Sequence, residues 1–321
     1  MRHTYRRTPT YRSVRFYSEQ SGNSGNFRQP KQYRKYLKPL LALCVIGGVI
    51  WFGNVVVNDH AKAPVLNTQK DTQKQAATKP QSLSVDASQS FAAMNDAVNS
   101  IIQANPTITF EVAVTDINTG DQVHFGQTGP MTAASVSKIL TATDYFKQVE
   151  LGKRTMQLVL EDGSTASYDM QQMIVVSNDT AWDAFRDNLT YAQLQAYGQA
   201  LGITNFQSQA NTLSAPDTAN LLGLLYKGQL LNSSDTALLL SYMKLANYRT
   251  YILPAIPSSD TVYHKIGLYE DNVNDATIIA NGKQTIALVI FTNGNGTYNW
   301  PNRAILMQDI AKPILKYYQL D

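Results

Sequence analysis

The sequence predicts an α+β fold, in which an antiparallel sheet is flanked by helices and stands beside an all-helical lobe. Two runs of strand-like composition, residues 108–114 and 121–125, come early in the folded part of the chain. Three more, residues 261–268, 273–280 and 284–292, come near its end, and the segment between the two groups has helical patterning. Strands at both ends of a helical middle indicate one sheet closed by N- and C-terminal segments.

The individual elements follow in chain order. Residues 87–104 place apolar side chains at helical spacing and predict an amphipathic helix. The turn sequence Asn-Thr-Gly at residues 118–120 joins the first two strands into a hairpin. Residues 135–151 predict a buried helix, and further helices follow to about residue 246. The last three strands lead into a final helix, which is predicted over residues 303–318.

The N-terminal part of the chain differs in composition from the rest. Residues 1–38 hold ten Lys or Arg side chains against one acid, Glu19, and lack the aliphatic residues that would bury a core. We therefore expect a disordered basic tail. Membrane topology alone explains its charge, so the sequence predicts no specific nucleic-acid partner.

Residues 39–57 predict one membrane span, in which only Asn54 is strongly polar. At about 1.5 Å per residue, a run of about 18 residues reaches about 27 Å, close to one hydrocarbon core. The preceding basic block places the tail in the cytoplasm and the rest of the chain outside the cell membrane. A signal-peptidase site at residues 61–63 or a lipoprotein signal at Cys44 fits less well, because Pro64 follows the first and no small residue precedes the second. We expect an uncleaved signal anchor.

The remaining chain divides into a stalk and a folded domain. Residues 58–85 contain no aromatic residue and predict a flexible extracellular stalk. Residues 86–321 hold 13 basic and 21 acidic residues, a net charge of −8, so the overall charge of +3 hides two opposite parts. A single cysteine, scattered histidines and the absence of phosphate-loop or dinucleotide motifs give no reason to expect a metal or a cofactor.

Ser135 and Lys138 form a Ser-x-x-Lys pair. On a helix that begins at Ser135, Lys138 lies nearly one turn further on, so its amine can reach the serine hydroxyl. A free serine is a poor nucleophile and needs a base, and a lysine serves when burial or a second cation lowers its pKa. Taken alone, such a pair more often marks a solvated helix start.

Two further motifs follow the Ser-x-x-Lys pair along the chain, and together with it they indicate a catalytic site. Ser177-Asn178-Asp179 comes after an apolar run, and Lys265-Ile266-Gly267 continues a strand-like run. Lys265 is the candidate for the second cation, and Gly267 would let a substrate backbone approach closely. His264 adjoins Lys265 but faces the opposite side of the strand, so we expect it to pack rather than react.

The ordered triplet resembles the motifs of the penicillin-recognising serine enzymes, that is, class A β-lactamases and D-alanyl-D-alanine peptidases. The resemblance covers about residues 86–321. Residues 213–222 are similar to the family's helix beyond the active-site loop, and residues 263–294 are similar to its closing antiparallel strands. The resemblance to this family implies a β-lactamase/transpeptidase-like fold of the α/β (α+β) class.

The resemblance also implies a role for each motif residue. Ser135 would be acylated, with Lys138 as its proton acceptor. Ser177 would relay a proton to the leaving nitrogen, and Lys265 would hold the substrate carboxylate. Backbone N–H groups of Ser135 and Tyr269 would form an oxyanion hole. The substrate-binding residues would be Asn178, Asp179, Ile266, Gly267 and Tyr269.

Three departures from the family pattern affect this interpretation. No glutamate lies between Thr180 and His264, where class A β-lactamases carry the one that activates the deacylating water, so the sequence predicts slow deacylation rather than efficient antibiotic hydrolysis. Asp179 replaces the usual asparagine, unless Asn178 has that role in a register shifted by one residue. Ile266 replaces a hydroxyl that binds the substrate carboxylate, a loss of about 1–3 kcal/mol.

Two functions stay open at this point. The first is a membrane-anchored extracellular serine hydrolase, which forms an acyl-enzyme on Ser135 with a D-alanyl-D-alanine-like peptidoglycan stem peptide or a β-lactam. The second is a non-catalytic cell-wall-binding module on the same fold, which the residues Asp179 and Ile266 suggest. The sequence assigns no oligomeric state.

Overall fold

The computed structural model describes residues 85–297 and 299–321. The predicted tail, the predicted membrane span and all but the last residue of the predicted stalk lie outside these residues. In the part of the chain that is described, no helix has both the length and the apolar character needed to cross a membrane.

A five-stranded antiparallel sheet forms the centre of the domain, in the order β2-β1-β7-β6-β5. This order confirms the prediction that strands from the beginning and from the end of the domain form one sheet. Its strands are β1 (Thr109–Asp116), β2 (Gln122–Gly126), β5 (Thr261–Tyr269), β6 (Asn272–Ala280) and β7 (Thr285–Asn293). Two short strands, β3 (Met131–Thr132) and β4 (Thr212–Leu213), pair separately.

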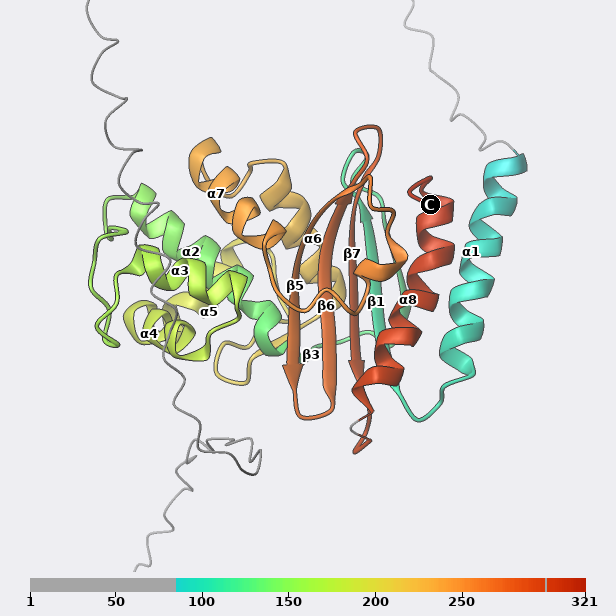
Figure 1. Ribbon diagram of the computed structural model, residues 1–321, viewed down its shortest axis with the longest axis horizontal. Helices are drawn as coiled ribbons and strands as arrows, with labels where there is room; N and C mark the ends of the chain where they lie inside the picture. The colour runs from blue at the N-terminus through green and yellow to red at the C-terminus, as the bar shows by residue number, and fades with distance from the viewer. Residues whose placement is uncertain (1–84, 298) are drawn as a thin grey trace, which may run out of the picture. The chain divides into compact units, whose positions relative to one another are not determined.

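Helices cover both faces of the sheet (Figure 1). On one face α1 (Val85–Gln103) packs against α8 (Trp300–Tyr317), and on the other α6 (Ala215–Tyr226) lies against β1 and β7. The helical lobe beside α6 consists of α2 (Lys138–Glu150), α3 (Ala166–Val175), α4 (Asp179–Leu189), α5 (Tyr191–Ala200) and α7 (Ser233–Lys244). A short 3₁₀ turn, η3 (Leu253–Ala255), precedes β5.

Polar side chains fix where most of the helices begin. The side chain of the residue before each of α3 to α7 accepts a hydrogen bond from a backbone N–H of the first turn, which has no partner inside the helix. These capping residues are Thr165, Asn178, Thr190, Ser214 and Asn232.

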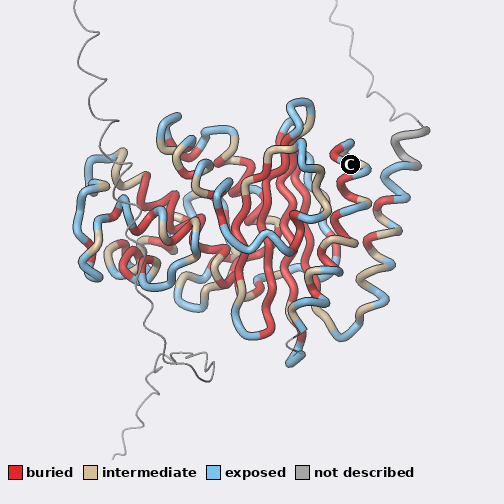
Figure 2. The backbone as a smooth tube through the Cα atoms, viewed as in Figure 1, coloured by how far each residue is buried: buried red, intermediate tan, exposed pale blue. Residues whose placement is uncertain are grey.

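The sheet separates two hydrophobic cores, because side chains alternate between its faces. Ala276 and Ile278 of β6 face the lobe, whereas Val273 and Ile279 of the same strand face α1 and α8. All nine residues of β6 are buried, which identifies it as an inner strand covered on both sides (Figure 2).

Three helix starts differ from the prediction. Helix α1 begins at Val85, two residues before the predicted start at residue 87. The helix predicted over residues 135–151 is a 3₁₀ turn, η2 (Ala134–Ser137), followed by α2, because Ala134 enters the turn with a φ of +49°. The final helix begins at Trp300 rather than at Arg303, since Asn299 caps it and a proline occupies its first turn.

Candidate active site

Ser135 lies half-buried in the η2 turn, between β3 and α2. The φ of +49° at Ala134 is a left-handed conformation that residues with a side chain rarely adopt. Ser137 Oγ and Asn211 Nδ2 both donate to the carbonyl oxygen of Ala134, at 3.0 and 3.1 Å. These two bonds hold a strained backbone conformation directly before Ser135.

Strand β5 contacts the same turn through Gly267. A Cβ atom at Gly267 would lie 2.5 Å from the carbonyl oxygen of Ala133 and 3.0 Å from the backbone nitrogen of Ser135. Only a glycine permits this approach. The close contact expected at Gly267 is therefore made by the chain's own Ser135 turn.

The amine of Lys138 does not bind Ser135, contrary to the expectation from their spacing. Nζ donates to Asp179 Oδ1 at 2.6 Å and to the carbonyl oxygen of Ser177 at 2.7 Å, and lies 3.4 Å from Ser177 Oγ. Among residues 85–297 and 299–321, none hydrogen-bonds the Ser135 hydroxyl. Helical spacing brings Lys138 near Ser135. The ion pair with Asp179, which joins α2 to α4, determines where the amine lies.

Ser177 joins the second lysine to this network. Lys265 Nζ donates to Ser177 Oγ at 2.7 Å and to the carbonyl oxygen of Ile266 at 3.1 Å. The side chain of Lys138 is 0% exposed, and Lys265 is 2% exposed. Ser177 itself has a φ of +60°, so both serines of the site lie in or beside left-handed backbone.

Burial lowers the pKa of both lysines. For Lys138 desolvation is the main cause, and the carboxylate of Asp179 opposes it. The pKa of Lys265 lies well below its ordinary value of 10.5, first because of burial and second because of the nearby charge of Lys138. Asp179 favours the ammonium form of Lys138, so of the two amines Lys265 loses its proton more readily.

The second motif begins helix α4. Asn178 Oδ1 accepts a hydrogen bond from the backbone nitrogen of Ala181 at 3.1 Å and so caps α4. Asp179 is the first residue of α4 and pairs with Lys138. The contacts of Ser177 with both lysines fit the unshifted register, in which Asp179 stands where the family has asparagine.

The side chain of Ile266 faces away from Ser135, and a substrate contact at this residue stays a prediction. Side chains alternate across β5, and while Lys265 faces the lobe, Ile266 is 3% exposed in the core beneath α8. Tyr269 ends β5 with its side chain largely exposed. The role of its N–H group in an oxyanion hole stays a prediction.

His264 lies on the face of β5 opposite Lys265, as expected. It is buried, with Nε2 3.2 Å from the carbonyl oxygen of Ala246 and Nδ1 3.8 Å from Asp275 Oδ1. Both contacts lie in the protein core, so they confirm the prediction that His264 packs rather than reacts.

Sequence reasoning missed the residues that support the site from distant segments. Asn274 of β6 donates to the carbonyl oxygen of Thr132 at 2.8 Å, next to the Ser135 turn. Trp182 of α4 donates its indole N–H to Thr141 at 3.0 Å, and the amine of Lys138 lies 5.1 Å from the centre of its ring. No local motif marks these residues, because their partners are far away in sequence. Asn211 belongs to the same group.

The model of a family described as "Beta-lactamase enzyme family" matches residues 93–318. The chain belongs to the β-lactamase enzyme family. This membership confirms the resemblance that the three ordered motifs indicated. No curated protein sequence matches the chain.

Solved structures agree with β-lactamase membership. PBP-A has a TM-score of 0.65 and 21% identity, over 70% of this chain and 96% of its own. A variant of the class A β-lactamase of the last common ancestor of Gram-negative bacteria has a TM-score of 0.63 and 17% identity, over 70% and 97%. The β-lactamase of Sphaerobacter thermophilus has a TM-score of 0.63 and 17% identity, over 72% and 98%. At these identities the likeness establishes the fold.

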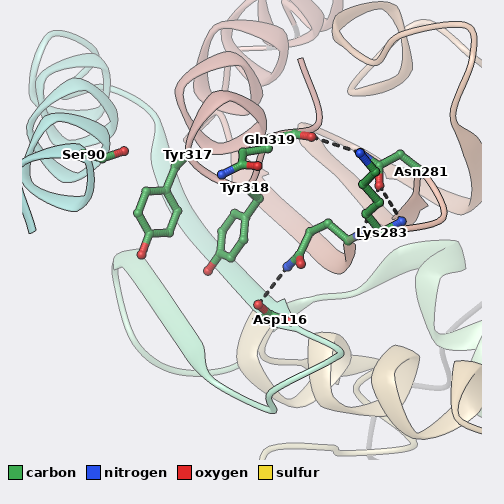
Figure 3. Close-up of a pocket in the computed structure, with 8 residues that line it drawn as sticks. Ser90, Asp116, Asn281, Lys283, Tyr317, Tyr318 and Gln319 are labelled. Carbon is green, nitrogen blue, oxygen red and sulfur yellow. Dashed lines mark hydrogen bonds between the residues drawn. The ribbon is translucent and has the colours of Figure 1, made fainter. Parts of the chain in front are cut away.

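One surface cavity of this β-lactamase-family domain lies away from Ser135. It measures about 560 Å³ and is lined by Ser90, Asp116, Asn281, Lys283, Gln284, Tyr317, Tyr318 and Gln319. Its polar groups largely bind one another: Gln284 donates to Asp116 at 2.8 Å, and Asn281 donates to the carbonyl oxygen of Gln319 at 3.0 Å (Figure 3). None of the predicted site residues lines this cavity, so side-chain geometry, not cavity volume, locates the candidate active site.

Proposed function

We propose that this chain is a membrane-anchored extracellular serine hydrolase, which forms an acyl-enzyme on Ser135 with a D-alanyl-D-alanine-like stem peptide of peptidoglycan or with a β-lactam. One observation supports the proposal most directly. The Ser177 hydroxyl lies between the buried amines of Lys138 and Lys265, beside the Ser135 turn. A solved PBP-A mutant, 21% identical to this chain, is described as an acyl-enzyme complex with penicillin G.

In the proposed reaction the Ser135 hydroxyl attacks the acyl carbonyl and transfers its proton to Lys138. The Oγ–C bond forms as the C–N bond breaks, and Ser177 passes a proton to the leaving nitrogen. The backbone N–H of Ser135 stabilises the developing oxyanion, together with an N–H from the end of β5. Before it can accept the proton, Lys138 must release its own proton to solvent and exchange its contact with Asp179 for one with Ser135.

We also propose that deacylation is slow. No glutamate lies between Thr180 and His264. The segment before β4 that contacts the Ser135 turn contributes Asn211, an amide that cannot act as a base at neutral pH.

Intact-mass spectrometry of the full chain with benzylpenicillin, sampled from minutes to hours, tests both statements. We expect a lasting adduct that maps to Ser135 and is absent from Ser135→Ala. An adduct that forms and then disappears with released product would contradict slow deacylation. Unchanged labelling of Ser135→Ala would contradict the assignment of the nucleophile.

A binding module without chemistry is the second candidate, and one observation favours it. The Ser135 hydroxyl has no hydrogen-bond partner within the described residues, and the Asp179 carboxylate holds the amine of Lys138. Turnover of a peptide or an ester that is lost in Lys138→Ala would exclude this candidate.

The location is a proposal from the N-terminal sequence. The basic residues 1–38 precede the apolar residues 39–57, which predicts that the catalytic domain lies outside the cell. A fluorescent penicillin that cannot cross the membrane should label intact cells producing the full chain. Labelling only after the cells are broken would contradict the proposed topology.

A further inference from the structure

We infer that Asp179 selects acyl donors that carry an ammonium group near the scissile bond. The inference rests on the proposed function and names a substrate class for the same site. It follows from the position of one carboxylate relative to the two lysines and the serine.

Asp179 belongs to the site, and its side chain is also exposed to solvent. Its Oδ1 accepts from Lys138 at 2.6 Å, yet its side chain is 79% exposed while that of Lys138 is 0% exposed. Within residues 85–297 and 299–321, no side chain or backbone group binds its other oxygen. A carboxylate offers about four lone-pair positions, so a second donor can bind without displacing the first.

The carboxylate also restricts which groups can bind beside it. An ionised carboxylate accepts hydrogen bonds and donates none, so it repels the carbonyl oxygen of a neutral amide side chain. An ammonium group donates and carries the complementary charge. The site therefore discriminates between two acyl donors that differ only in this group.

The charges around Asp179 match a substrate that carries both signs. Lys265 lies on the other side of Ser177, where a substrate carboxylate would bind. Along α4, the charges of Asp183 and Arg186 pair with each other, and Arg186 stacks 4.1 Å from the ring centre of Trp182. The charge of Asp183 also acts on Lys138, but Asp179 is the acid of this helix that binds the amine directly.

A bound ammonium would also affect the reaction itself. It would share the carboxylate with Lys138 and weaken the ion pair that keeps the lysine from Ser135. The substrate's own cation would then help to release the lysine that must accept the serine proton. Acyl donors without this cation would have to break the ion pair unaided.

The test compares two β-lactams that differ at one position. Benzylpenicillin and ampicillin share the ring system and the phenyl group, and ampicillin adds one amino group next to the side-chain carbonyl. The measurement is the second-order rate of acylation of the full chain by each compound, followed by intact mass. The readout is the ratio of the two rates, which a general loss of stability would not change.

For the natural chain we expect ampicillin to react faster, by roughly tenfold, as a hydrogen bond between charged groups implies. Asp179→Asn should bring the ratio close to one, and Asp179→Glu should keep the preference. Asp187→Asn removes the same charge from an exposed position further along α4 and should leave the ratio unchanged.

The possible failures can be told apart. If both compounds acylate Ser135 and the ratio is the same in the natural chain and in Asp179→Asn, the inference is wrong and the proposed function stands. If neither compound acylates the natural chain, the proposed function fails, and the inference fails with it. A ratio that changes equally in Asp187→Asn would show a general charge effect and would also overturn the inference.

Discussion

Two buried lysines share one hydroxyl in this site, and one exposed carboxylate makes them unequal. Lys138 and Lys265 both contact Ser177 Oγ, but within the part of the chain that the structure describes only Lys138 has a carboxylate partner. Since two ammonium groups so close together repel each other, the carboxylate determines which lysine keeps its proton. Asp179 thereby controls the base that the proposed reaction requires.

Asp179→Asn should shift the pH dependence of acylation. The carboxylate raises the pKa of Lys138 against the lowering by burial, so its removal lowers that pKa. The neutral amine then exists at lower pH, and the rising limb of the pH–rate profile should move to lower pH. Rates of acylation by benzylpenicillin, measured across pH for both proteins, check this. A shift to higher pH would show that Lys138 is not the titrating base.

The motif residues could be predicted from sequence, but their contacts could not. Ser135, Lys138, Ser177 and Lys265 lie in motifs with fixed local spacing, and local spacing is visible in a sequence. The partner of Lys138 depends on how α2 packs against α4, and the supports at Asn211 and Asn274 come from other elements. The sequence identifies Asp179 as a departure from the family pattern, and the structure adds that its carboxylate holds the amine of Lys138 away from Ser135.

At the scale of elements, the site depends on strand β5 packing directly onto the η2 turn. Gly267 makes this contact possible, and the alternation of side chains along the strand then places Lys265 on the lobe side. The sequence predicts strands β5, β6 and β7 to within a residue or two, because each contains β-branched or aromatic residues and the turns between them contain Gly, Asn or Asp. The 3₁₀ turn was missed because Ala134 is an ordinary helix former with an uncommon φ.

Gly267→Ala should damage the site and the fold together. The added methyl group would lie 2.5 Å from the carbonyl oxygen of Ala133, so β5 or the turn must move. We expect a loss of about 1–3 kcal/mol in the free energy of unfolding and slower acylation. Urea unfolding and acylation rates measure the two effects.

Gly223→Ala is the matched control for that substitution. Gly223 lies within α6, and its added methyl group would have Ile117 as nearest neighbour, at 4.0 Å. Alanine in a helix is favoured over glycine by about 1 kcal/mol, so this variant should be as stable as the natural chain or more stable. Equal damage from both substitutions would contradict the close-approach argument.

At the scale of the whole molecule, Glu111 links stability to pH. It lies fully buried on β1, where one oxygen accepts from the backbone nitrogen of Ala215 at 3.0 Å and the other has no partner within the described residues. Burial raises its pKa from 4.5 to about 7. The folded state therefore holds this proton more tightly than the unfolded state does.

Stability should fall between about pH 4.5 and pH 7 for this reason. A carboxyl whose folded pKa is raised contributes fully below its unfolded pKa, and the contribution is lost as pH rises through the folded value. The shift corresponds to about 3 kcal/mol. Urea unfolding at pH 5 and pH 8 should show a smaller pH effect in Glu111→Gln than in the natural chain. If Glu111→Gln shows the same pH effect as the natural chain, other groups cause the pH dependence of stability.

The pairing of β1 with β7 has a kinetic consequence. Strand β1 can pair early with β2, but Thr109 lies opposite Asn293, so β1 gains its second neighbour only after almost all of the domain has been synthesised. Contacts between such distant segments slow folding, because the chain must close a long loop before any of them stabilises it. A ribosome still synthesising this protein would therefore carry an incomplete sheet, and the candidate site, which needs β5, would form only at the end.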